Sequence, residues 1–135
     1  MFTKKQIKDL ALEAYQEFSK KHNVQCEISM IELDKFWKLA RKSKLVQDDL
    51  KKRIPLKVGA LVLHGEKEII YLNQDIVNQL SNQPMFVKAL VMHELSHIYL
   101  KNKIKENSIE EEIKSENRVS DFVNSEFPIY SGYLI

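Results

Sequence analysis

The spacing of hydrophobic residues predicts at least three helices. Behind Thr3, a residue type that caps helices, apolar side chains recur every three or four positions as far as about residue 22. From Met85 to Leu100, directly after Pro84, the residues are apolar nearly all round, which is typical of a buried helix. A third segment, residues 109–123, carries many charges but keeps one apolar stripe. The predicted helices therefore lie near the start, in the second half and close to the end of the chain.

Strands are predicted between the first two helices. Residues 24–30 alternate between apolar and polar, as in a strand with one buried face. Two further apolar runs, 56–64 and 68–72, flank a short turn that contains Gly65, and they predict a β-hairpin. Together with the helices, these strands indicate an α+β fold with about three strands. The 135 residues, of which 44% are hydrophobic, suit one domain spanning residues 1–135.

The helix predicted at Met85 to Leu100 contains an HExxH motif, because residues 93–97 read His-Glu-Leu-Ser-His. Two residues four positions apart lie on the same face of a helix, so His93 and His97 can bind one metal ion. Glu94 is then placed to take a proton from a metal-activated water. Buried polar side chains need partners, and one metal ion could be the partner of His93, Glu94 and His97. The simpler alternative is that both histidines are ordinary helical residues with satisfied hydrogen bonds. The motif predicts metal-assisted hydrolysis.

A catalytic zinc site usually takes three protein ligands, so a third one is expected outside the motif. The longer metzincin motif would require Gly at position 100 and His at position 103, but the chain has Leu100 and Lys103. The two other histidines, His22 and His64, both precede the motif. The candidates downstream of the motif are the carboxylates of residues 109–123.

Helical periodicity favours one of these carboxylates. At about 100° per residue, Glu116 falls within the apolar stripe and Glu112 lies at its edge. The stripe consists of Ile109, Ile113, Glu116, Ser120 and Val123. Because an unpaired buried carboxylate is costly, we expect Glu116 to be the third ligand, with Glu112 as the alternative. The contrasting interpretation is that Glu116 is a solvated side chain on a charged helix.

The motif and the carboxylate that follows it resemble the gluzincins, zinc peptidases with an HExxH helix and a Glu ligand from a later helix. More similar still is the ImmA/IrrE type of peptidase domain, in which a strand ending in Asn precedes the HExxH helix and the last helix reads roughly E-x-x-A-[ND]-x-F-A. Residues 69–73 resemble that strand, and residues 116–123 resemble that helix. The similarity covers residues 68–123. It departs at Ser120, where the family carries an Asn or Asp that orients a zinc-bound His.

This resemblance implies a zinc metallopeptidase. One Zn²⁺ would be held by His93, His97 and Glu116, with Glu94 as the general base. A peptide or protein substrate would lie extended along one of the hairpin strands. Tyr130, Tyr133 and His64 are candidates for a further donor to the transition state, although all three have simpler structural interpretations. The rival from another class is a non-catalytic binding or regulatory module that keeps zinc as a structural staple.

The C-terminal tail, residues 125–135, is rich in large apolar side chains, while Pro128 and Gly132 oppose continued helix. We expect it to pack as a last strand or lid. A second possibility follows from a similarity in size to the archaeal minigluzincins, some of which are held latent by a terminal segment. The tail would then cover the cleft, with a backbone carbonyl or the carboxylate of Ile135 near the metal, or it would mediate self-association.

Charge is unevenly distributed along the chain. Residues 35–57 carry nine Lys or Arg against two Asp, a net charge of +7, whereas the whole chain carries +2. We interpret this segment as a solvated basic loop or one that meets an acidic partner, and we do not expect a nucleic-acid partner, because no binding motif accompanies it. No apolar run has transmembrane length and no signal peptide is recognised, so a cytoplasmic protein without a membrane partner is expected. Cys26 is expected to be an inert, buried thiol.

Overall fold

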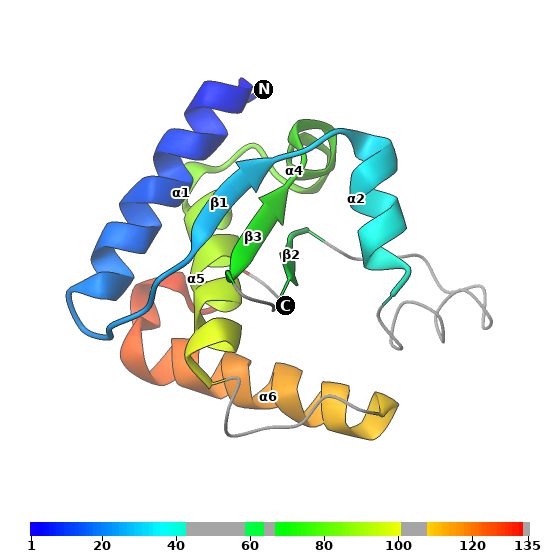
Figure 1. Ribbon diagram of the computed structural model, residues 1–135. Helices are drawn as coiled ribbons and strands as arrows, with labels where there is room; N and C mark the ends of the chain where they lie inside the picture. The colour runs from blue at the N-terminus through cyan, green and yellow to red at the C-terminus, as the bar shows by residue number, and fades with distance from the viewer. Residues whose placement is uncertain (43–58, 64–66, 101–107, 134–135) are drawn as a thin grey trace.

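The protein has an α+β fold, as the sequence predicts (Figure 1). The computed structural model describes residues 1–42, 59–63, 67–100 and 108–133. Within these ranges the elements are α1 (Lys4–Ser19), β1 (Glu27–Met30), α2 (Leu33–Ala40), β2 (Leu61–Leu63), β3 (Ile69–Leu72), α4 (Gln74–Leu80), α5 (Pro84–Leu100), α6 (Ile109–Glu126) and a 3₁₀ turn, η1 (Pro128–Tyr130). No helix in these ranges is long and apolar enough to cross a membrane.

In the described part of the chain the sheet has three strands in the order β1-β3-β2, with β1 parallel and β2 antiparallel to the central β3. The β2–β3 pair confirms the predicted hairpin, although part of the run predicted at 56–64 lies outside the described residues. The strand predicted at 24–30 begins only at Glu27, which pairs with Ile69. One reason is that the carbonyl of Val24 accepts a hydrogen bond from the Tyr15 hydroxyl, at 2.8 Å, rather than joining the sheet.

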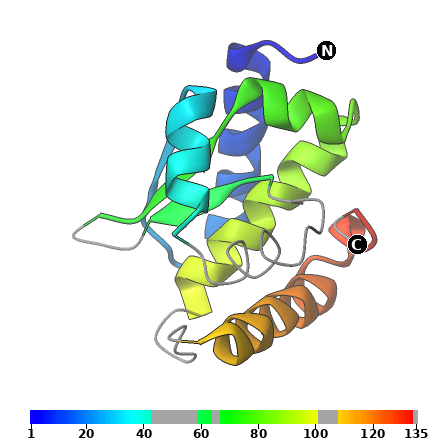
Figure 2. The same ribbon diagram turned by 90° about the vertical axis from the view of Figure 1, so that its right-hand side faces the viewer.

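The core forms where α1 and α5 lie side by side against one face of the sheet (Figures 1 and 2). Thr3 begins α1 with a capping box, in which its side chain accepts from the backbone of Gln6 and the Gln6 side chain accepts from the backbone of Thr3. Buried residues occur on every side of α5, which confirms the prediction from its all-round apolar pattern. The HExxH motif is thus carried by the helix at the centre of the molecule, a firm support for functional side chains.

Two helices were not predicted. α2 overlaps the start of the segment interpreted as a basic loop, and that interpretation is wrong for residues 35–40. Phe36 and Ala40 are buried, so the apolar residues at helical spacing determine the structure there and the lysines remain on the outer side. Arg41 and Lys42 follow α2 and are exposed, and the remaining basic residues of this segment fall in residues 43–58, which lie outside the described residues.

The second of these helices, α4, follows β3 after a single residue, Asn73. The Asn73 side chain accepts a hydrogen bond from the backbone N–H of Ile76, at 3.0 Å, and donates one to the carbonyl of Ile31, at 2.9 Å. Asn73 is buried, and these two bonds satisfy both ends of its amide. Asn73 therefore caps α4 and ties it to the connection that follows β1.

In the C-terminal tail, α6 is followed by a 3₁₀ turn rather than by a strand. Phe127 and Tyr130 are buried, whereas Ile129 between them is 69% exposed. Gly132 has a φ of 89°, a backbone conformation that favours glycine, and Tyr133 is half-buried after it. The prediction that the tail packs as a last strand is therefore wrong for residues 128–130, which form η1. Residues 134 and 135 lie outside the described part of the chain.

Candidate metal centre

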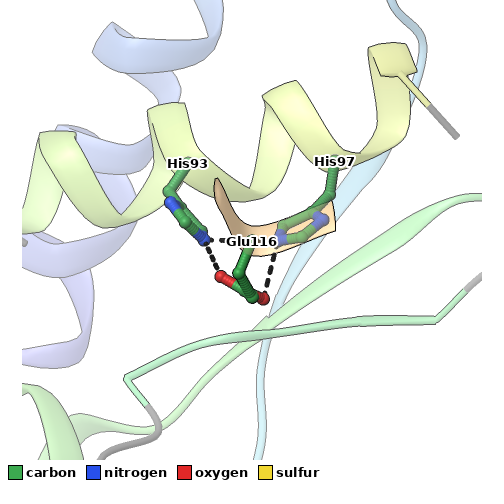
Figure 3. Close-up of side chains that lie close together, drawn as sticks. All are labelled: His93, His97 and Glu116. Atoms are coloured by element: carbon green, nitrogen blue, oxygen red, sulfur yellow. Dashed lines mark hydrogen bonds and ion pairs between the residues drawn. The ribbon is translucent and has the colours of Figure 1, made fainter. Parts of the chain in front are cut away.

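The two histidines of the HExxH motif lie next to each other on α5. Their rings are 4.9 Å apart between centroids, and their Nε2 atoms are separated by 3.2 Å. The side chain of His93 is 15% exposed and that of His97 is 9% exposed. Figure 3 shows both rings on the same side of the helix, with the Nε2 atoms turned toward a common point. This is the arrangement that the four-residue spacing predicts.

Glu116 approaches the same point from α6. Its Oε2 lies 2.8 Å from Nε2 of His93, and its Oε1 lies 3.0 Å from Nε2 of His97 (Figure 3). Each residue of the trio thus offers one nitrogen or oxygen atom to a shared position, and the three donor atoms all lie within 4.8 Å of one another. The structure brings together the three residues that the sequence predicts as ligands.

The face that α6 turns to the rest of the protein differs from the predicted stripe. Ser115, Val119 and Val123 are buried, while Ile113 is 45% exposed and Ser120 is exposed. At about 100° per residue, the buried face is rotated by roughly 80° from the predicted one. The prediction that this stripe forms the buried face of α6 is therefore wrong.

The rotation places Glu116 at the edge of the buried face rather than in its middle, and its side chain is 46% exposed. Glu112 lies on the buried face one turn nearer the start of α6, but it does not belong to the group that could hold a metal ion. An edge position suits a ligand, because a catalytic metal needs protein donors on one side and open space for water and substrate on the other.

The charge state of Glu116 suits a ligand as well. Burial acts to raise the pKa of Glu116, but hydrogen bonds and charge interactions with His93 and His97 outweigh burial and hold that pKa well below its ordinary value. A carboxylate must be ionised to bind a metal ion. The site therefore keeps its acidic member in the ligating form without help from a metal.

The donor set fits a small divalent cation. Two imidazole nitrogens and a carboxylate oxygen are a common ligand set for catalytic zinc, with bonds of about 2.0–2.2 Å. Two donors of a tetrahedral ion at these bond lengths are about 3.3–3.6 Å apart, so the donors here, which are separated by 2.8 to 3.2 Å, must move apart by less than about 1 Å to receive the ion. Among the described residues this group contains three donors, which leaves a coordination position for water or substrate.

Glu94 follows His93 on α5 but is not part of the ligand group. It is half-buried and makes an interaction within the protein. The proposed role of Glu94 as a base is compatible with this position, since a base must lie beside the metal without binding it.

A cavity of about 190 Å³ opens next to His93. It is lined by Ala89, His93, Ser120, Val123, Asn124, Tyr130 and Gly132. The lining thus comes from α5, α6 and the tail, and it includes one of the three candidate ligands. Ser120, the position at which the chain departs from the ImmA/IrrE pattern, faces this cavity.

Of the three side chains predicted as candidate donors to the transition state, the structure describes Tyr130 and Tyr133. The hydroxyl of Tyr130 donates a hydrogen bond to Glu17 on α1, and Glu17 also pairs with Lys88, whose Nζ lies 2.6 Å from Oε1 of Glu17. Burial and the hydrogen bond to Glu17 raise the pKa of Tyr130 to about 12, so this side chain is a neutral donor already engaged with α1. Tyr133 is half-buried, and His64 lies outside the described residues.

Sequence reasoning missed one residue that touches the site. The hydroxyl of Ser115 lies 3.3 Å from Nδ1 of His97, on the side of the ring away from Glu116. The sequence does contain a signal for it, because Ser115 is a small polar residue directly before Glu116. The predicted stripe, however, placed Ser115 outside the core.

Comparison of the chain with protein-family models, with curated proteins and with solved structures found no match. The function therefore has to be inferred from the site and its chemistry.

Proposed function

We propose that the protein is a zinc-dependent metallopeptidase of the gluzincin type. The observation that carries the proposal is the convergence of His93 and His97 from α5 with Glu116 from α6. Glu116 lies 23 residues from His93 along the chain, so the helix geometry of α5 cannot by itself explain their contact. A fold that brings an ionised carboxylate to both imidazoles of an HExxH motif has the donors of a catalytic zinc site.

The residues of the chain would divide the work of hydrolysis. His93, His97 and Glu116 would hold one Zn²⁺ ion, which when bound lowers the pKa of water toward 7 and polarises a carbonyl. Glu94 would accept the proton of the attacking water and deliver it to the leaving amine. The position of Glu94 supports this role, because it directly follows His93 on α5 and lies outside the group of donors.

Two features suggest where a peptide substrate would bind. β2 is an edge strand of the described sheet and contacts α5, so an extended peptide could add to it by backbone hydrogen bonds. The cavity beside His93 could receive one side chain of that peptide, and its volume of about 190 Å³ suits a residue of moderate size. A substrate held in this way would place its backbone along α5, close to the ligands.

The proposal is tested by metal analysis of the purified protein combined with a peptide-library cleavage assay. We expect about one zinc ion per chain, cleavage of some peptides, loss of cleavage with a chelator and recovery on addition of zinc. A protein that holds no zinc would contradict the proposal. A protein that holds zinc but cleaves no peptide, even with its tail trimmed, would instead favour a non-catalytic binding or regulatory module.

Trimming the tail is included because we also propose that the tail limits access to the site. Tyr130 and Gly132 line the cavity next to His93, so the tail already borders the space that a substrate would enter. The buried Tyr130 is anchored to Glu17, and a useful truncation must therefore begin after it.

Deleting residues 132–135 is expected to raise peptide cleavage on the order of 10-fold, the gain that results when an open state populated at about 10% becomes fully populated. Cleavage rates and zinc content should be measured for the full chain, for this truncation and for a shorter one that lacks only 134 and 135. A rise in both truncations would assign the effect to the last two residues. A folded, zinc-containing truncation that is no faster than the full chain would exclude a latent state.

A further inference from the structure

Ser115 contacts the one ring nitrogen of His97 that faces away from the metal position. Its Oγ lies 3.3 Å from Nδ1 of His97, and the residue is only 4% exposed. The other nitrogen, Nε2, lies 3.0 Å from Glu116 and 3.2 Å from Nε2 of His93. The ring of His97 is therefore held between two partners from the same helix, with one nitrogen directed to each.

A histidine can bind a metal through Nε2 only when that nitrogen has a free lone pair, so the neutral ring must carry its proton on Nδ1. A serine hydroxyl can accept a hydrogen bond from that N–H. This bond favours the tautomer that a metal needs and keeps the ring from rotating. Partners of this kind typically change metal affinity by 10–100-fold when they are removed.

We propose that Ser115 is a positioning residue that holds His97 in the tautomer and orientation for binding zinc through Nε2. The inference rests on the proposed metal centre and adds a function for a side chain that does not itself bind the ion. Because Ser115 directly precedes Glu116, α6 would supply both a ligand and the support for a second ligand. The docking of one helix would thus set two of the three metal contacts.

The position of Ser115 differs from that of the orienting residue in the ImmA/IrrE pattern. The ImmA/IrrE pattern places an orienting Asn or Asp at position 120, but Ser120 is exposed on the far side of Glu116 and lines the cavity. The hydrogen bonds described for His93 both use its Nε2. Support on the Nδ1 side is therefore seen at His97, and it comes from the buried face of α6.

The test compares zinc affinity in Ser115→Ala, Ser115→Thr and a control, Ser96→Ala. Ser96 is also a buried serine and directly precedes His97, but its hydroxyl donates a hydrogen bond to the carbonyl of Met92, at 2.7 Å, whereas the hydroxyl of Ser115 lies against His97. We expect Ser115→Ala to weaken zinc binding by about 10-fold or more and Ser115→Thr to restore most of it, since threonine keeps the hydroxyl. The Ser96 variant should bind zinc like the parent.

Two spectroscopic measurements distinguish positioning from packing. The visible absorption of the Co²⁺-substituted protein reports the geometry around the metal, and it should change in Ser115→Ala but not in Ser96→Ala. In the zinc-bound parent, nitrogen-15 NMR should show the Nδ1–H of His97 in slow exchange with water, and Ser115→Ala should accelerate that exchange. If the threonine variant does not fold, these two signals decide the question.

A folded Ser115→Ala protein with unchanged zinc affinity, Co²⁺ spectrum and Nδ1–H exchange would overturn the inference and leave the metal centre intact. A parent protein that binds neither zinc nor Co²⁺ would instead remove the metal centre, and this inference with it.

Discussion

Replacing Glu94 by glutamine is expected to slow peptide cleavage by at least about 100-fold while zinc content stays at the parent level, because general base catalysis typically contributes 10²–10⁴-fold. The two side chains have nearly the same shape, but an amide cannot accept the proton of the attacking water. Glu94 lies outside the group of three donors, so its charge is not needed to hold the ion. Cleavage rates and bound zinc should be measured on the same preparation.

The matched control for this variant is Glu110→Gln. Glu110 is exposed on the first turn of α6 and is not part of the donor group, so this change removes the same charge from a residue outside the site. We expect cleavage by the control to equal that of the parent. Equal cleavage by the parent and by Glu94→Gln, with zinc bound in both, would show that Glu94 is not the base.

The features that the sequence predicted well are those that local structure determines. His93 and His97 meet because four residues make about one helical turn, and the helix itself is signalled by Pro84 and by apolar residues on all sides. The same holds for α1, whose capping box needs only Thr3 and Gln6. Such features depend on neighbours in the sequence, so a periodicity analysis can find them.

The orientation of α6 could not be predicted in the same way. The sequence offers Ile109 and Ile113 as the start of an apolar stripe, yet Ile113 is exposed and the smaller Ser115 and Val119 are buried. Which face of a charged helix docks depends on the shape of α5 rather than on apolar content alone, and a single exposed isoleucine costs little. Glu116 was thus selected correctly as a neighbour of the histidines, but from a stripe that the fold does not bury.

Two further differences have comparable causes. α2 was overlooked because its lysines dominate the composition of the segment, although Phe36 and Ala40 keep helical spacing. The contact of Tyr130 with Glu17 joins residues 113 positions apart, and neither residue carries a local sign of it. Long-range contacts of this kind follow from the packing of α1, α5 and the tail, which a single sequence does not specify.

Replacing Glu116 by alanine is expected to weaken zinc binding on the order of 10-fold or more, a lower bound because removal of even an indirect partner of a ligand has that effect. The carboxylate contacts Nε2 of both His93 and His97, at 2.8 and 3.0 Å, and no other carboxylate of the described residues belongs to the donor group. Zinc affinity should be measured by competition with a chelator of known affinity, and cleavage should fall in parallel.

The acidic first turn of α6 provides the controls for this last prediction. Glu110→Ala and Glu111→Ala remove the same charge from the same helix, so they test whether affinity follows the net charge of α6 or one particular carboxylate. Glu112→Ala tests the alternative ligand, which lies on the buried face one turn from Glu116. If Glu116→Ala binds zinc like the parent while Glu112→Ala loses it, the third ligand is Glu112, one turn nearer the start of α6.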